Sequence, residues 1–563
     1  MKKIVSLICA ATLFACCMLT SCKRGDNEDP WNKPLNEGAT QLSVSNFDGG
    51  FGTEWLALAA RRFEEKYKNE SFERGKTGVQ ISIEPIKTVA SGVISTMQDS
   101  STNLFFTEQV YYYDAVSSNK FLDITDIVTE TLTEYGETKS IEQKLTKEEQ
   151  NYYKTADGKY YGLPHYSGYF GITYDIDLFE SKQLFLARDE NNGNNGFYRP
   201  NTSDKLSLGA DGVEGTYDDG LPATYDEFFK LCARIVSKGM TPLVWSGVNR
   251  DGYWREFLDA LYTDYEGLEQ MMLNYTFDGN ADNLVKSYAS AKDGSISDMV
   301  TESLKISASN GYELNRQAGR AYALSFLERV LRGNYYAEES KDESMSHVEA
   351  QLTYLESSLK GEPIAMCLDG CFWFNEADDA FRQLEEEYGS KAKEENRRFG
   401  FMPLPKATKE KAGKQTLMDY LYSCGFINAN ISAEKAKAAK LFLQFLYTDE
   451  SLREFTVTTN CPKACVYTMG DSYDQLSYYG KTLWDNKENS DIVYPFSTSA
   501  LYLNNQSKFN IYYNWTSRMD GVTKSAPIDA LRKDNIKAET YFYGIQKYYN
   551  KTDWDNNYSR YFD

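Results

Sequence analysis

The stretch that decides the fold is residues 158–179, GKYYGLPHYSGYFGITYDIDLF. It begins as an aromatic, turn-rich run, breaks at Pro164 and passes through the small-residue segment 167–171. Gly168 and Gly171 allow backbones to approach more closely than bulkier residues would, and the tyrosines place flat faces with hydroxyls around them. We interpret this stretch as a crossing between two lobes that lines the cleft between them. A buried strand with aromatic packing is the alternative.

Length and composition indicate a globular protein with more than one lobe. At 563 residues the chain exceeds what one hydrophobic core usually serves. Hydrophobic residues make up 41% of the chain, which is enough to build such cores. The 43 tyrosines and 30 phenylalanines are a surplus of aromatic rings, and such rings often line recognition surfaces.

The N-terminus has the pattern of a secretory signal. Lys2 and Lys3 precede an apolar run, 4–19, that is too short for a comfortable membrane span. Residues 19–22, Leu-Thr-Ser-Cys, resemble the bacterial lipobox, which implies cleavage before Cys22 and acylation of its thiol with a lipid such as palmitate. An ordinary signal peptide with an incidental cysteine is the alternative.

We therefore expect a signal peptide over 1–21 and a lipid-anchored, flexible tether over 22–40, on the extracytoplasmic face of the cell membrane. Removing the two lysines with the signal changes the net charge from −21 to −23. Such an acidic protein repels phosphate backbones and anionic headgroups, so nucleic acid is excluded as a partner and lipid must provide the anchor.

Six cysteines remain beyond Cys22, and their state is open from the sequence. Two pairs have C-x3-C spacing, which is not the usual zinc-site spacing. Export permits disulfides, but buried free thiols agree with the sequence equally well. The six are Cys232, Cys367, Cys371, Cys424, Cys461 and Cys465.

The first part of the chain alternates between strand and helix patterns. We expect strands over 41–47, 78–86 and 103–106, with helices over 53–67 and 89–99 between them. This rhythm predicts an α/β lobe with a largely parallel sheet. In such sheets ligands bind beyond the carboxyl ends of the strands, which here are the segments that follow the first and third strands.

The second part has a different order of elements. Thr224 and Glu227 predict a capping box at the start of a helix over 225–238, followed by a short strand over 241–246. A long helical region, broken by loops, is expected from there to about residue 388. Strands over 399–405 and 420–428 and an amphipathic helix over 433–448 complete the prediction.

Taken together, these segments resemble the extracellular solute-binding proteins of bacterial ABC importers, in the large sugar-binding group that includes maltose-binding protein. The matching residues are 158–164 with 174–179, 221–228, 361–366 with Gly370 and Trp373, 402–405, and the helix 433–449. The resemblance covers most of residues 41–470. It implies two α/β lobes joined by hinge strands, with a ligand cleft between the lobes.

The resemblance also implies where the lobes and hinges lie. The first lobe would comprise 41–168 plus 421–466, and the second 169–420 plus 467–563. The hinges would lie near 167–171, 421–424 and 462–466.

A sugar site needs aromatic faces for the apolar sides of the rings and carboxylates or amides for their hydroxyls. The family usually places a stacking aromatic near residues 370–373, and here either Phe372 or Trp373 would fill that role. Ordinary core packing is the alternative for every candidate. The candidate ligand-binding residues are Asp48, Glu54, Trp55, Glu108, Gln109, Tyr111, Tyr166, Tyr169, Trp245, Asp251, Trp254, Phe372 and Trp373.

The resemblance implies a monomeric, lipid-anchored binding component that captures a carbohydrate, such as an oligosaccharide, by lobe closure and delivers it to ABC permease subunits. With only two histidines, a histidine-based metal site or a Ser-His triad is not expected, so we predict no enzyme activity. A secreted glycoside hydrolase and a glycan-display or adhesion lipoprotein are the alternatives.

One further motif lies in the polar insert before the predicted capping box. In residues 209–220, Asp211, Asp218 and Asp219 fall partly on the pattern of a calcium loop. We expect no required cofactor, with a structural calcium ion at these carboxylates as a hypothesis. A solvated Gly/Asp hairpin is the alternative.

Overall fold

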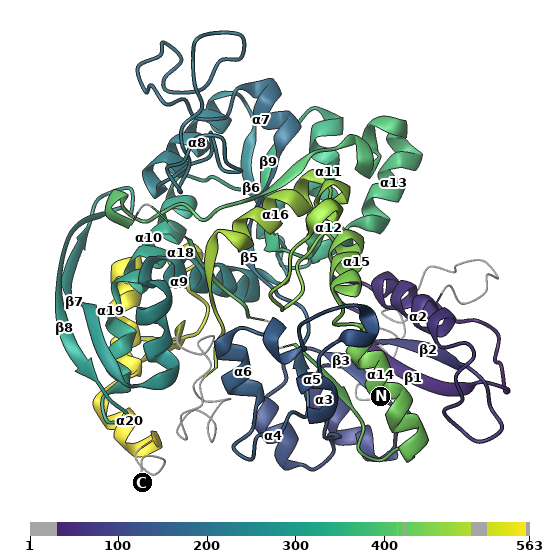
Figure 1. The fold of residues 1–563 in the computed structure, drawn as a ribbon. Helices are drawn as coiled ribbons and strands as arrows, with labels where there is room; N and C mark the ends of the chain where they lie inside the picture. The colour runs from purple at the N-terminus through teal and green to yellow at the C-terminus, as the bar shows by residue number, and fades with distance from the viewer. Residues whose placement is uncertain (1–30, 412, 414, 421–422, 497–514, 559–563) are drawn as a thin grey trace, which may run out of the picture.

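The computed structural model describes residues 31–411, 413, 415–420, 423–496 and 515–558, and it has two α/β lobes, each built on its own sheet (Figure 1). The predicted signal peptide, Cys22 and the start of the tether lie outside these residues. Within the described part, no helix is long and apolar enough to cross a membrane.

The sheet of the first lobe is largely parallel, as predicted, and its strand order is β2-β1-β3-β12-β4. Strand β1 runs parallel to both β2 and β3, and β12 alone runs against its neighbours. The strands are β1 (Thr40–Phe47), β2 (Val79–Ile86), β3 (Leu104–Thr107), β4 (Leu163–Pro164) and β12 (Cys424–Ile427).

Helices cover this sheet with their apolar faces. In α2, the residues Trp55, Leu56, Ala59 and Phe63 recur at helical spacing and are buried, which confirms the predicted helix. The helices of the lobe are α2 (Glu54–Lys66), α3 (Ala90–Thr96), α4 (Tyr112–Ser117), α5 (Thr125–Thr129), α6 (Lys147–Tyr153), α14 (Ala433–Phe445) and α15 (Asp449–Thr459).

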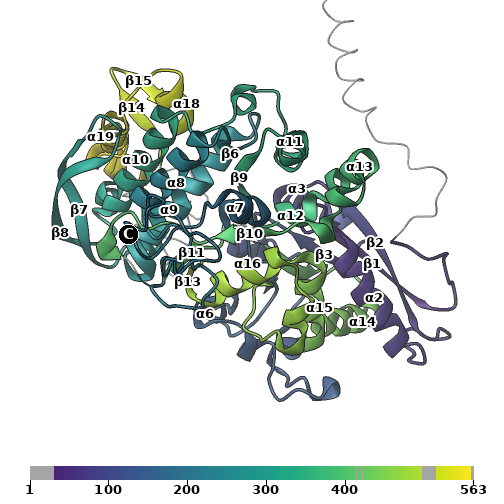
Figure 2. The same ribbon diagram turned by 90° about the horizontal axis from the view of Figure 1, so that it is seen from above.

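The sheet of the second lobe has the order β10-β5-β9-β6. Strand β5 is antiparallel to both β9 and β10, and β6 is parallel to β9. All residues of β5 and β9 are buried, because helices lie on both faces of this sheet (Figure 2). The strands are β5 (Phe170–Asp175), β6 (Thr241–Val244), β9 (Ile364–Gly370) and β10 (Phe399–Met402).

The predicted capping box at the start of α8 is present. The Thr224 hydroxyl accepts a hydrogen bond from the Glu227 backbone N–H, and the Glu227 side chain accepts one from the Thr224 N–H. The helices of the lobe are α7 (Ile176–Lys182), α8 (Tyr225–Ser237), α9 (Arg250–Thr276), α10 (Ala318–Arg332), α11 (His347–Lys360), α12 (Trp373–Glu376), α13 (Asp378–Tyr388) and α16 (Tyr478–Glu488).

The long helical region predicted after the strand β6 is wrong in its middle, where the chain forms an antiparallel hairpin of β7 (Gly279–Ser290) and β8 (Ile296–Ile306). The hairpin lies beside helix α19 (Ala538–Tyr548) (Figure 1), and the ring centroid of Tyr288 in β7 lies 5.5 Å from that of Phe542 in this helix. The remaining elements are β11 (Gln415–Met418), β13 (Ser490–Val493), β14 (Ser517–Met519), β15 (Val522–Lys524), α18 (Pro527–Arg532) and α20 (Lys551–Tyr558).

Candidate ligand-binding cleft

Three chain segments pass between the lobes side by side. Residues 165–169 connect β4 to β5, residues 419, 420 and 423 lie between β11 and β12, and residues 460–477 lead from α15 to α16. Residues 421 and 422 of the predicted hinge 421–424 lie outside the described residues. Backbone and side-chain hydrogen bonds tie these segments to one another, so the lobes are joined at one shared edge.

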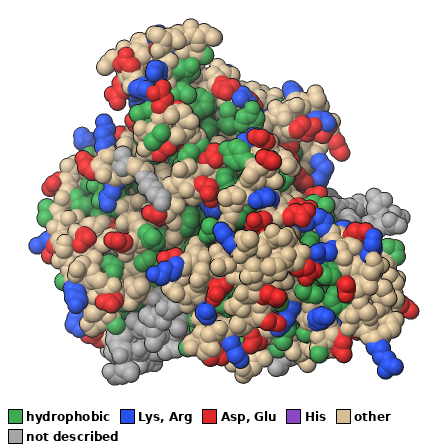
Figure 3. All heavy atoms as spheres, in the orientation of Figure 1, with side chains coloured by type: hydrophobic (Ala, Val, Ile, Leu, Met, Phe, Trp, Pro, Cys, Tyr) green, Lys and Arg blue, Asp and Glu red, His purple; other side chains and the backbone are tan. Residues whose placement is uncertain are grey.

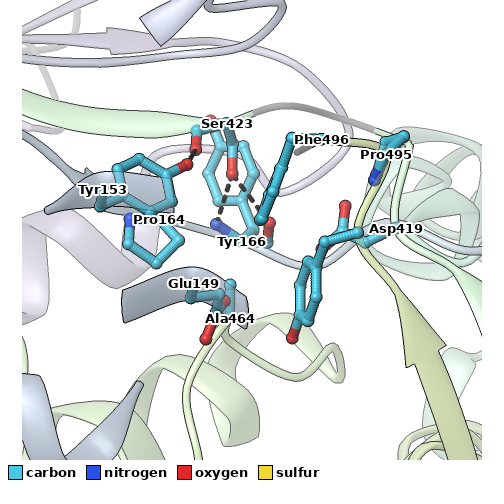
Figure 4. Close-up of a pocket in the computed structure, with 10 residues that line it drawn as sticks. Glu149, Tyr153, Pro164, Tyr166, Asp419, Ser423, Ala464, Pro495 and Phe496 are labelled. Atoms are coloured by element: carbon cyan, nitrogen blue, oxygen red, sulfur yellow. Dashed lines mark hydrogen bonds between the residues drawn. The ribbon is translucent and has the colours of Figure 1, made fainter. Parts of the chain in front are cut away.

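Several of these ties involve the first crossing. The Ser423 hydroxyl accepts a hydrogen bond from the Tyr166 N–H at 2.9 Å and donates one to the Tyr166 carbonyl at 2.8 Å (Figure 4). The Ala464 N–H donates to the His165 carbonyl at 3.1 Å. The Gly168 N–H donates to Oδ1 of Asp419 at 3.4 Å.

Acidic side chains from both lobes gather beside these crossings. Glu108 follows β3 in the first lobe, whereas Glu256 lies on α9, Asp369 on β9 and Glu376 on α12 in the second. Asp419 lies on a crossing. These five carboxyl groups come from five separate parts of the chain.

The pKa values of three of these groups are raised by burial and by neighbouring negative charges. Burial and, to a smaller extent, the negative charges of Asp419 and Glu376 raise the pKa of Glu108 to about 8. Burial also raises the pKa of Asp369 to about 8, with a contribution from Glu376. The pKa of Glu256 is also raised to about 8. Burial is the largest cause; Arg255 lowers the pKa, and the charges of nearby carboxylates raise it. These carboxyl groups therefore lie in a desolvated region, where their neutral, protonated form is favoured.

Aromatic rings line the same region. The ring centroid of Phe170 lies 5.0 Å from that of Tyr253 and 6.1 Å from that of Tyr420. Phe51 of the first lobe stacks on Tyr166 at 4.2 Å and contacts Phe372 of the second lobe at 5.8 Å. Carboxylates and aromatic faces together suit a polar ligand with apolar faces.

The loops of the two lobes touch at the edge of this cleft. The side-chain amide of Asn375 donates a hydrogen bond to the Gly50 carbonyl at 2.8 Å. A Cβ atom added at Gly50 would lie 2.2 Å from Cδ2 of Phe372, so only glycine allows this approach. The structure therefore has the lobes in contact.

Comparison with known proteins identifies the family. A family described as bacterial extracellular solute-binding protein matches residues 60–464, which is more than half of the chain. The chain belongs to this family. No curated protein sequence matches it.

Solved structures of binding proteins share the fold of this solute-binding protein. One, titled "Chitin oligosaccharide binding protein", aligns with a TM-score of 0.50 and 14% identity over 91% of this chain and 98% of its own. A second, "SBP RafE in complex with raffinose", aligns with a TM-score of 0.52 and 12% identity over 91% and 99%. Apo RafE from Streptococcus pneumoniae aligns with a TM-score of 0.50 and 13% identity over 92% and 99%. These alignments show that this solute-binding protein has the two-lobed α/β fold.

Some of the residues predicted from the sequence lie together at the cleft. Burial and then the negative charges of Glu108 and Asp48 raise the pKa of Tyr166, and Phe372 covers Gly50. Tyr169 lies on the first crossing, where burial and then the charge of Asp419 raise its pKa.

Other predicted residues lie apart from this group. Trp55, Trp245, Trp254 and Trp373 are each at most 2% exposed; Trp373, for example, contacts Tyr354, Phe399 and Tyr479 edge-on. Their positions fit the alternative of core packing, and Tyr166 and Tyr169, each 1% exposed, are just as buried although they lie on the first crossing.

The polar candidates outside the group are more exposed. Glu54 is exposed at the start of α2, and Gln109 is exposed with a φ of +59°. Tyr111 is half-buried just before α4. Asp251 is half-buried, with Oδ2 3.6 Å from an Arg255 nitrogen.

Much of the acidic site of this solute-binding protein was absent from the sequence predictions. Tyr253 and Glu256 lie three residues apart, hence on one face of α9, whereas the predicted Trp254 between them points into the core. This three-residue spacing is the sequence pattern from which Tyr253 and Glu256 could have been predicted to act together. The unpredicted members of the site are Tyr253, Glu256, Asp369, Glu376, Asp419 and Tyr420.

The loop considered for calcium is held by its own hydrogen bonds. Oδ2 of Asp218 accepts from the backbone N–H groups of Ala210 and Asp211, and Oδ1 accepts from the Thr216 hydroxyl. Asp219 accepts from the Gly215 N–H. In the part of the chain that the structure describes, no group of three or more His, Cys, Asp or Glu could hold a metal ion. Calcium at this loop stays a prediction.

The six cysteines beyond Cys22 are all buried free thiols. Cys371 and Cys461 lie beside the crossings: the Cys371 N–H donates to the Tyr169 carbonyl at 2.7 Å, and the Cys461 thiol donates to the Cys371 carbonyl at 3.2 Å. Of the alternatives left open by the sequence, free thiols are the one present.

Proposed function

We propose that this solute-binding protein is the lipid-anchored component of an ABC importer and that it captures a carbohydrate in the cleft by lobe closure. The observation that carries the proposal is the meeting of carboxylates and aromatic rings from both lobes beside the crossings. Glu108 and Phe51 come from the first lobe, and Asp369, Glu376 and Phe372 from the second.

This combination of groups suits a sugar. The apolar faces of sugar rings pack on aromatic side chains, and buried carboxylates accept short hydrogen bonds from sugar hydroxyls. The titles of two structures with the same fold name a chitin oligosaccharide and raffinose as the ligands of those proteins. The family and these neighbours are binding proteins, which favours capture over hydrolysis.

Lobe closure would follow from contacts that only the closed form provides. A ligand shifts the equilibrium only if it binds the closed form more tightly than the open one. The lobe-to-lobe contacts Asn375–Gly50 and Phe372–Phe51 lie at the edge where the two halves of the cleft meet. A ligand between Glu108 and Asp369 would add further contacts across the same edge.

A thermal-shift screen of mono- and oligosaccharides, followed by calorimetry, tests the proposal. A ligand that binds only the native state raises its melting temperature, and small-angle scattering should then record a more compact protein with the ligand than without it. Release of reducing ends from the bound oligosaccharide would instead support the glycoside hydrolase. Absence of any carbohydrate ligand would overturn the proposal.

The membrane anchor needs a separate test, because Cys22 lies outside the described residues. We expect Cys22→Ala to move the protein from the membrane fraction to the soluble extracytoplasmic fraction. A variant that stays in the membrane fraction would contradict the lipid anchor. Co-purification of the wild type with permease subunits would test the transport partner.

A further inference from the structure

Side chains close the outer edge of strand β2. This strand lies at the edge of the first-lobe sheet, where backbone groups need partners other than a strand. The Ile81 N–H donates a hydrogen bond to Oε1 of Glu64 at 2.9 Å, and the Ile81 carbonyl accepts one from Nη2 of Arg61 at 3.2 Å. The Ile83 N–H donates to Oδ1 of Asn32 at 2.7 Å, and its carbonyl accepts from Nδ2 of Asn32 at 3.0 Å. One amide side chain thus pairs with Ile83 as a neighbouring strand would.

The segment that supplies this amide, residues 31–36, also contacts helix α2. We call this segment the strap. The Trp31 carbonyl accepts a hydrogen bond from Nη2 of Arg61 at 2.9 Å, and Nζ of Lys33 forms an ion pair with Oε2 of Glu64 at 2.9 Å. The first half of the strap is therefore bound to α2 as well as to β2.

The second half of the strap is held by Gln80 of β2. Nε2 of Gln80 donates to the Pro34 carbonyl at 2.8 Å, and Oε1 accepts from the Asn36 N–H at 2.7 Å. Gln80 is buried, so water competes little for its amide. Contacts along its whole length hold the strap against the first lobe.

The strap limits the distance between the first lobe and the expected lipid anchor. A chain spans at most about 3.6 Å per residue. If the chain were free up to the start of β1 at Thr40, the lobe could lie up to about 65 Å from the lipid on Cys22. With the strap bound, Trp31 lies at most about 32 Å from Cys22 along the chain. The side of the lobe that binds the strap is therefore kept near the membrane.

Charge gives the protein little orientation at a membrane. The chain carries a net charge of −21, which repels anionic headgroups. On the face of the molecule shown in Figure 3, acidic and basic side chains are interspersed. The position at which the anchor is held must then decide which side approaches the lipid.

The strap lies at one end of the molecule. In both views, α2 and β2 are at the opposite end from the hairpin of β7 and β8 (Figures 1 and 2). A short connection to the α2 end therefore places the hairpin end farther from the anchor.

We propose that the strap fixes the lipid anchor to the first lobe, so that helix α2 and the outer edge of β2 face the lipid bilayer and the hairpin end of the second lobe points away from it. This inference rests on the lipid anchor of the proposed function. The first lobe would stay at the membrane, and lobe closure would move the second lobe relative to it.

Energy transfer to labelled lipids tests the orientation. The lipidated full-length protein is extracted from membranes and placed in nanodiscs whose headgroups carry an acceptor dye. A donor dye is attached after Glu65→Cys on α2 or Asp298→Cys on β8; both positions are exposed, whereas the six cysteines beyond Cys22 are buried. We expect a larger loss of donor fluorescence at position 65 than at position 298, because transfer falls steeply with distance.

A strap variant tests the cause of this difference. Asn32→Ala combined with Lys33→Ala removes the side chains that bind β2 and α2, and it should reduce the difference between the two donor positions. Hydrogen exchange of the Asn36 N–H should become about two- to tenfold faster, as expected for the loss of a hydrogen bond. Asn396→Ala is the control, because its exposed side chain bonds only within the second lobe; it should change neither measurement. Melting curves establish that each variant is folded.

The other outcomes separate this inference from the proposed function. Equal transfer at both positions, or more transfer at position 298, in a membrane-bound protein would overturn the orientation and leave the anchor and the carbohydrate function standing. A full-length protein that does not associate with membranes would overturn the anchor and the orientation together. A difference between the positions that persists unchanged in the strap variant would overturn the strap as its cause.

Discussion

Asn375 of the second lobe and Gly50 of the first, 325 residues apart in the chain, are joined by a hydrogen bond of 2.8 Å from the side-chain amide to the backbone carbonyl. The bond crosses between the lobes at the edge of the acidic cleft. It therefore belongs to the closed arrangement and should contribute to the affinity for a ligand enclosed there.

Loss of this bond should favour the open form. A hydrogen bond contributes a net free energy of about 0.5–1.5 kcal/mol, so we expect Asn375→Ala to weaken ligand binding by about two- to tenfold in calorimetry. Asn396→Ala is the matched control, because the exposed Asn396 side chain bonds only within its own lobe, to the Ser390 carbonyl. Equal affinity of both variants would show that the contact does not contribute to closure.

Phe372 and Trp373 are adjacent in sequence but have different surroundings. Phe372 is half-buried and faces Phe51 across the cleft edge, whereas Trp373 is fully buried in the second lobe. We expect Phe372→Ala to weaken ligand binding by about 1–3 kcal/mol while the fold survives. Trp373→Ala should instead lower the free energy of unfolding by about 3–5 kcal/mol. Calorimetry and denaturant titration measure the two effects, and a reversed pattern would move the ligand contact to Trp373.

Raised pKa values in the cleft predict how the stability of the ligand-free protein depends on pH. The pKa values of Glu108, Glu256 and Asp369 are raised to about 8, so the folded state holds protons that the unfolded state releases above about pH 4.5. The stability contributed by these carboxyls is thus present at low pH and is lost between about pH 5 and about pH 8.

Comparison of variants isolates this effect. Asp419 and Glu376 act on the pKa of Glu108, Arg255 acts on that of Glu256, and His347 lies beside Glu376. Burial lowers the pKa of Lys463 to about 7. Its contribution to stability therefore increases as the pH rises, opposite to that of the carboxyls. We expect the melting temperature of the wild type to fall more than that of Glu108→Gln from about pH 5 to about pH 8. Parallel curves for the two proteins would show that Glu108 does not titrate with a raised pKa.

The hydrogen bonds of Asp218 predict a stabilising role for its loop. Because the carboxylate accepts from two backbone N–H groups and one hydroxyl, Asp218→Ala should lower the melting temperature whether or not a chelator is present. A calcium ion at the loop predicts a different result: the chelator would lower the melting temperature of the wild type and have no effect on the variant. Calorimetric scans with and without chelator distinguish the two.

Local patterns predicted most elements of the first lobe. The apolar spacing of α2 and the alternation of β1 and β2 depend on nearby residues only, and their predicted bounds agree with the structure to within one residue. The hairpin of β7 and β8 was missed for a local reason too. Register shifts between Ala281 and Leu284 and between Val285 and Ser287 break the strict alternation that marks a strand.

The acidic cleft was harder to predict because its members meet only in three dimensions. Asp369 and Glu256 lie on different elements of the second lobe, and Glu108 reaches them from the first. Trp254 was predicted to contact the ligand, but its side chain is buried, whereas its neighbours Tyr253 and Glu256 lie toward the cleft. Sequence patterns locate the crossings and the lobes, whereas charge clustering across them depends on the tertiary fold.

A crystal structure of the mature protein with a carbohydrate identified by screening tests the central claim most directly. The account predicts a sugar enclosed between the lobes that contacts Glu108 from the first lobe and Asp369 or Phe372 from the second. A sugar bound outside this cleft, or one that contacts a single lobe only, would contradict the account.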